Sequence, residues 1–132
     1  MAKYLMVPGD YNAGDNIPLL DTNLCSRYTY HEGGSPIVQV KGSGCPHRPF
    51  RYLIGETVTM TALATTAEQL ALTVDGVRIG GGLLSIDSAA AGEINTASIV
   101  NEIGAGGSSR IAVQAVTALR ITDGVLIVNK ED

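Results

Sequence analysis

The stretch Leu70-Ala71-Leu72-Thr73-Val74-Asp75-Gly76 decides the fold class. Leucine or valine stands at every second position from 70 to 74, so these side chains share one face of an extended strand. Asp75-Gly76 follows at once, and this pair suits the two positions of positive φ that a tight hairpin turn requires. The stretch therefore predicts a strand that ends in a hairpin.

A helix over residues 63–72 is the alternative for this region, because Thr66-Ala67-Glu68-Gln69 matches a capping box. In that motif the side chains of the first and last residues satisfy free backbone N–H groups at the start of a helix. The alternating residues and the hairpin turn that follow favour a strand, and we expect the strand.

The rest of the chain repeats this pattern of short strands and turns. Valine, isoleucine and threonine are abundant, and their branched side chains suit strands. Glycine accounts for 16 of the 132 residues, and turn signals recur at intervals of about ten residues. Strands are predicted near 17–20, 24–31, 36–41, 48–54, 57–63, 69–75, 77–79 leading to 83–87, 94–100, 109–118 and 124–129. This spacing predicts an all-β sandwich or barrel.

Residues 1–16 have a different character. They combine turn-forming residues with an apolar tip, Tyr4-Leu5-Met6-Val7. We expect an extended N-terminal arm over 1–16 whose tip docks on a partner, followed by one sandwich domain over 17–132. A frayed terminus or a first edge strand is the alternative.

Composition limits the classes of partner. The net charge is −4, no basic run is present, and 45% of the residues are hydrophobic against 17% charged. This composition predicts a folded domain that binds neither nucleic acid nor anionic membranes. No apolar stretch reaches the roughly 18 residues of a membrane span, and the first residues do not resemble a secretory signal. We therefore expect a protein that stays where it is made.

The residues give no metal site. Cys25, His31, Cys45 and His47 are the only cysteines and histidines, and their spacings do not match those of zinc ligands. A disulfide between the two cysteines is possible across neighbouring strands. Without an export signal, buried free thiols are the expectation. We predict no metal and no cofactor.

Catalytic signatures are missing as well. The sequence holds no Gly-x-Ser-x-Gly elbow, and its glycine-rich segments lack the lysine and the helix of a phosphate-binding loop. The order Gly14-Asp15 reverses what a calcium-binding loop requires. We expect no enzymatic activity.

Two late strands are apolar on both faces. Ile111 and Val113 share one face, whereas Ala112 and Val116 belong to the other, and Val125-Leu126-Ile127-Val128 is apolar throughout. The outward face of an antiparallel sandwich is usually polar, so such strands need a second cover. A segment of the same chain could provide it. We favour self-association through this sheet.

Four aromatic residues, Tyr28, Tyr30, Phe50 and Tyr52, lie on two predicted neighbouring strands. They predict either an aromatic ladder inside the sandwich or a binding face. Taken together, the residues expected at a partner interface are Tyr4, Leu5, Met6, Val7, Tyr28, Tyr30, Tyr52, Val116, Leu126 and Val128.

The order of several segments carries a family resemblance. These segments are Ile17–Cys25, His31–Ser35, Val38–Gly42, Leu70–Gly76 and Leu126–Lys130. In this order they resemble small jelly-roll (TNF-like) virion proteins of tailed bacteriophages and prophages of gut Firmicutes. The resemblance covers about residues 17–130 and implies an antiparallel jelly-roll β-sandwich.

The resemblance also implies a role. It points to a non-enzymatic capsid decoration or head-fibre-type protein that forms a homotrimer and binds the phage major capsid protein. Such a protein is made in the host cytoplasm and ends on the outer capsid surface. The alternative is a carbohydrate- or receptor-binding jelly-roll module, with Tyr28, Tyr30 and Tyr52 as a stacking platform for a surface glycan.

Overall fold

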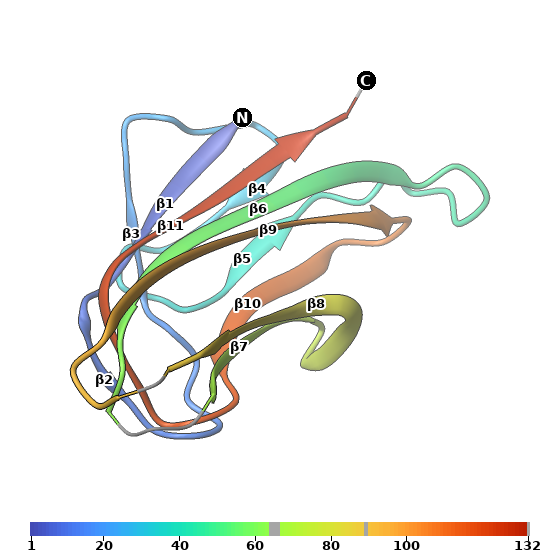
Figure 1. Ribbon diagram of the computed structural model, residues 1–132. Coiled ribbons are helices and arrows are strands. Elements are labelled where there is room, and N and C mark those ends of the chain that lie inside the picture. The colour runs from blue at the N-terminus through green and yellow to red at the C-terminus, as the bar shows by residue number, and fades with distance from the viewer. Residues whose placement is uncertain (64–66, 89, 132) are drawn as a thin grey trace.

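The computed structural model describes residues 1–63, 67–88 and 90–131, and shows two antiparallel sheets packed face to face (Figure 1). The first sheet has the order β3 (Leu19–Asp21), β1 (Ala2–Met6), β11 (Leu119–Lys130), β6 (Phe50–Thr61) and β9 (Ile94–Ala105), with β2 (Gly9–Tyr11) also paired to β11. The second sheet has the order β4 (Thr29–Tyr30), β5 (Val38–Val40), β10 (Ser109–Ala115), β7 (Ala67–Val74) and β8 (Val77–Asp87).

From β5 onward the chain passes repeatedly from one sheet to the other. This crossing pattern, with antiparallel partners throughout, is that of a jelly roll. The all-β jelly-roll sandwich expected from the sequence is therefore confirmed. No described residue belongs to a helix that could cross a membrane.

The hairpin that decides the fold class forms as predicted. β7 covers 67–74 and pairs with β8, and the turn places Asp75 at φ 53° and Gly76 at φ 83°. The helix considered for 63–72 is wrong, because its residues from 67 onward form a strand. Thr66, the first residue of the supposed capping box, lies outside the described residues.

The N-terminal segment differs from the expected free arm. β1 lies inside the first sheet, with Tyr4 opposite Leu126 on one side and Asp21 on the other. Gly14 and Ile17 then donate backbone hydrogen bonds to β10 of the second sheet, at 2.7 and 2.8 Å. The segment is thus part of the sandwich, because Ala2, Tyr4 and Met6 point into the core and the residues after them pair with β11 and β10. β1 and β11 run side by side, with Ala2 opposite Val128 (Figure 1).

Two supposed breaks fall inside long strands. Residues 48–54 and 57–63 were expected as separate strands, yet β6 runs through Gly55 without interruption. Asp123-Gly124 reads as a turn but forms an irregularity inside β11, where the register with β6 shifts between Ile121 and Asp123. Glycine is tolerated in strands at bulges and at places where another chain segment approaches closely.

Candidate interaction surfaces

The outward side of the first sheet carries a continuous set of apolar side chains. We call it the outer apolar face. Its members are Leu5, Leu20, Leu53, Val100, Val125 and Ile127. Val100 is 65% exposed and Leu20 45%, while Val125 and Ile127 are half-buried. Exposed apolar patches that are contiguous commonly mark interaction sites.

Strand register makes this face contiguous. Leu5 lies opposite Leu20 on one side and opposite Val125 on the other, so three strands contribute to one row. In the next row Ile127 lies opposite Gly55, which lies opposite Val100. Because Gly55 has no side chain, the surface is recessed there, between the side chains of Ile127 and Val100.

Polar groups border the outer apolar face. Hydroxyl groups pair across β6 and β9, with Thr57 Oγ1 2.9 Å from Ser98 Oγ. Lys3 stands on β1, and Glu102 stands on β9 within 3.1 Å of the Arg51 guanidinium. The face therefore has a lysine on one flank and the Arg51–Glu102 ion pair on the other.

Five residues predicted at a partner interface lie in the core instead. They are Tyr4, Met6, Tyr52, Leu126 and Val128, each at most 5% exposed. Successive strand residues point to opposite faces, so Leu126 and Val128 point inward and their neighbours Val125 and Ile127 point outward. The two residues of β11 predicted at an interface therefore face the core, and the outward side chains of this strand are their neighbours.

The other five predicted residues are at least partly accessible. Leu5 is 37% exposed and Tyr30 61%, while Val7, Tyr28 and Val116 are half-buried. Tyr28 packs edge-on against Phe50, with 5.8 Å between ring centroids. The predicted ladder of four aromatic residues is wrong, because β6 belongs to the first sheet and β4 to the second, and among these four described residues only the Tyr28–Phe50 ring contact forms. Among the tyrosines proposed as a stacking platform, Tyr30 is the exposed one.

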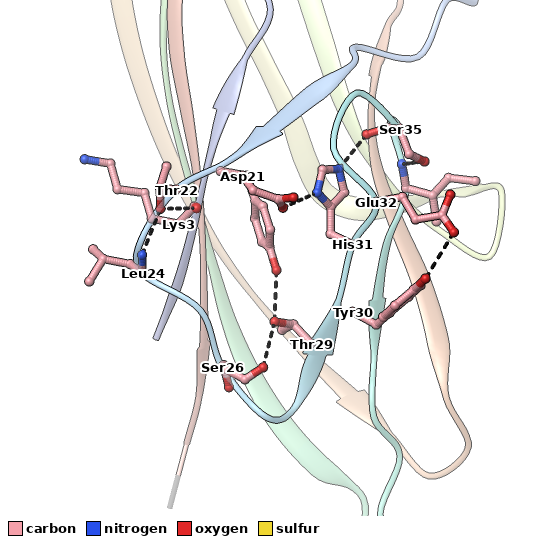
Figure 2. A network of polar contacts seen from close by, with 12 residues as sticks. Lys3, Asp21, Thr22, Leu24, Ser26, Thr29, Tyr30, His31, Glu32 and Ser35 are labelled. Atoms are coloured by element: carbon pink, nitrogen blue, oxygen red, sulfur yellow. Dashed lines mark hydrogen bonds and ion pairs between the residues drawn. The ribbon is translucent and has the colours of Figure 1, made fainter.

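His31 anchors a polar network at the edge of the sandwich (Figure 2). Its Nδ1 lies 2.6 Å from Asp21 Oδ1, and its Nε2 lies 2.7 Å from the Ser35 carbonyl oxygen. A carbonyl can only accept, so Nε2 carries a hydrogen and donates it. The Tyr4 ring packs on the imidazole at 4.9 Å between centroids. With its side chain only 1% exposed, His31 clamps the loop after β4 onto β3.

Neither cysteine lies where it was expected. Cys25 and Cys45 are both free, and both are exposed rather than buried. Within the described ranges, no three His, Cys, Asp or Glu side chains gather closely enough to hold a metal ion. His31 lines a hollow of about 340 Å³ together with Asp21 and Cys25, but its two ring nitrogens are engaged by Asp21 and the Ser35 carbonyl and not by the thiol.

A buried carboxyl group lies in the core. Glu56 on β6 is 1% exposed and points between the sheets, as do its strand neighbours Ile54 and Val58. No described residue hydrogen-bonds to either of its carboxylate oxygens. Burial raises the pKa of Glu56 from an ordinary 4.5 to about 7, because the charged form loses its hydration. Its only trace in the sequence is an acidic residue within an alternating apolar run.

Solved structures share this fold. Murine APRIL at pH 8.5 superimposes with a TM-score of 0.63 at 14% identity, over 97% of this chain and 98% of APRIL. The globular domain of zebrafish complement 1qA gives a TM-score of 0.59 at 9% identity, over 98% of this chain and 96% of the domain. No family model and no curated protein matches the sequence. The likeness establishes the architecture: this chain has a jelly-roll fold, as do APRIL and the C1qA globular domain.

Proposed function

We propose that this chain is a non-enzymatic structural protein that assembles into a homotrimer through its outer apolar face. The observation that carries the proposal is the run of apolar side chains across β3, β1, β11, β6 and β9 on the outward side of the sheet. Covering such a surface removes apolar area from water, and each Å² buried contributes about 25 cal/mol. The occupant that we propose is a second copy of the chain.

The number of copies that we propose rests on the sequence resemblance. Lys3 borders the face on β1, and the Arg51–Glu102 ion pair borders it on β9, at the far side of the sheet. Such flanks can meet in a two-fold dimer as well as in a ring, because a two-fold contact pairs residue i with j and j with i. A three-membered ring is the state that the resemblance to virion jelly-roll proteins implies.

The wider role that we propose is capsid decoration. The assembled trimer would bind the phage major capsid protein on the outer surface of the virion, as the sequence resemblance implies. The low content of charged residues, 17% of the chain, supports a protein whose surface is largely covered by neighbours. Antibodies against the protein should then label the outside of intact particles from the strain that encodes it.

The solution mass of the purified chain tests the assembly. Light scattering should give about three times the chain mass of 13.7 kDa. Val100→Asp places a charge at the most exposed member of the outer apolar face and should convert the assembly to monomers. Val77→Asp is the matched control, because Val77 is equally exposed at 68% but lies on the second sheet. A wild-type monomer, or equal effects of the two substitutions, would overturn the proposal.

A further inference from the structure

A recess on the outward side of the second sheet is independent of the outer apolar face. It has a volume of about 610 Å³, within the range of small-molecule sites. Its floor is formed by Thr73 and Ala112, and its walls by Asn16, Ile37, Arg110 and Gln114, with Asp75 at one end. We call it the outer recess.

Small side chains create the floor. Thr73 on β7 lies directly opposite Ala112 on β10, and both point away from the core that holds Leu72 and Val113. The Thr73 hydroxyl donates to the Ala112 carbonyl oxygen at 3.3 Å, so it stays low and fixed. The result is a flat surface between taller polar walls.

The walls hold polar groups of two kinds. Gln114 is fixed in place, because its Oε1 accepts from Arg78 Nε at 3.0 Å and its amide donates to the Gly14 carbonyl oxygen at 3.4 Å. The Arg110 guanidinium and the Asn16 amide have no hydrogen-bond partner among the described residues. These two groups are available to a ligand without breaking an existing contact.

The recess continues toward an exposed aromatic ring. A second hollow of about 190 Å³ shares Arg110 and Ile37 with the outer recess and reaches Tyr30. Strand register places Tyr30 opposite Gln39, and Gln39 opposite Arg110, in one row across β4, β5 and β10. Tyr30 is 61% exposed, and its hydroxyl donates to Glu32 Oε1 at 3.0 Å, which holds the ring in place.

We propose that this groove binds a neutral oligosaccharide, with one sugar in the outer recess and the next against the Tyr30 ring. Amide, guanidinium and carboxylate groups present donors and acceptors in fixed pairs, which suit neighbouring hydroxyl groups on a sugar ring. The flat C–H face of a pyranose packs on an aromatic ring, and the tyrosine edge hydroxyl stays in water.

Charge and topology select this ligand class. In the outer recess the Arg110 cation is balanced by the Asp75 anion, so neither an acidic nor a basic ligand gains from net charge. In the outer recess a peptide strand has no free edge to pair with, because β10 is bonded to β5 on one side and to β7 on the other. Among the described residues that line the recess, Ile37 is the one large apolar side chain, too little for an apolar peptide anchor.

Binding of the full chain to an array of neutral and acidic oligosaccharides tests the proposal, followed by NMR titration with the best neutral glycan. We expect backbone shifts that concentrate at residues 73, 110–114 and 30. Tyr30→Ala and Arg110→Ala should each weaken binding about tenfold, the loss of one good contact, whereas Tyr30→Phe should retain it. Arg51→Ala, the same change on the first sheet, is the control.

Three results would overturn the inference: no neutral glycan bound, binding of acidic glycans only, or shifts that map elsewhere. Ala112→Leu gives a second check, because a larger side chain fills the floor without removing any polar wall. Its fold is verified by the unchanged NMR spectrum outside the recess. The groove and the outer apolar face lie on opposite sheets, so the glycan test and the mass measurement fail or succeed separately.

Discussion

The side chain of Met6 on β1 occupies the space that a side chain at Gly124 on β11 would need. A β-carbon built on Gly124 would lie 2.6 Å from Met6 Sδ and 3.0 Å from Met6 Cβ. Met6 is 2% exposed, so it has little room to move aside. The missing side chain at Gly124 is therefore a condition for the packing of the first strand.

Gly124→Ala should destabilise the fold by about 1–3 kcal/mol, the usual cost of overpacking a core. Chemical denaturation measures it. Gly80→Ala is the control, because a β-carbon there meets no atom within 4 Å. Equal stability of the two variants would mean that Met6 yields without cost.

Gly76→Ala should cost about 1 kcal/mol for a different reason. Gly76 has open space around it but a φ of +83°, where an L side chain is strained. Thermal unfolding of this variant beside Gly80→Ala isolates the backbone effect. A Gly76→Ala protein as stable as the wild type would show that the turn can change its conformation freely.

Glu56 should make stability fall as the pH rises. Below about pH 4.5 its carboxyl is protonated in both states, and between pH 4.5 and 7 the unfolded chain ionises while the folded one keeps its proton. Over this window the unfolding free energy falls by an amount on the order of 3 kcal/mol. It levels off once the pH exceeds the folded-state pKa of about 7.

The difference in unfolding free energy between wild type and Glu56→Gln isolates this effect from other titrating groups. Relative to wild type, Glu56→Gln should become more stable as the pH rises from 5 to 8, by about 1.4 kcal/mol per pH unit at the steepest point. Glu56→Leu should behave in the same way. Parallel stability curves for wild type and variants would show that the carboxyl is already solvated or paired.

Both thiols of the folded chain should react with a water-soluble disulfide reagent without denaturant, because Cys25 and Cys45 are free and exposed. The released chromophore should correspond to two thiols per chain, and the Cys25→Ser and Cys45→Ser variants should each release half as much. Reaction only after unfolding would contradict their exposed positions.

Local features of the fold could be predicted, and long-range ones could not. The β7–β8 hairpin follows from residues that touch in sequence, and the positive φ values at Asp75 and Gly76 need no other part of the chain. β1 needs partners such as Val125, 120 positions away from Leu5, and no local signal reports that pairing. The segment was therefore expected as an arm.

The facing of β11 was missed for a related reason. Leu119 and Ile121 point inward at odd positions, while Leu126 and Val128 point inward at even ones, because the irregularity near Asp123 shifts the alternation. An apolar run such as 125–128 does not reveal which of its side chains point into the core and which point outward. The outer recess draws on separate segments, and its residues share no spacing that a motif could report.

The pairing of Ala2 with Val128 has a mechanical consequence. The first and last strands are antiparallel neighbours, so opposite forces on the two chain ends pull β1 and β11 apart across their hydrogen bonds. Those bonds lie perpendicular to the strands and are then loaded one after another. The sheet should open like a zipper at low force, starting beside the chain ends. Covering β1 by a neighbouring copy would raise that force, so assembly and resistance to pulling are linked in this fold.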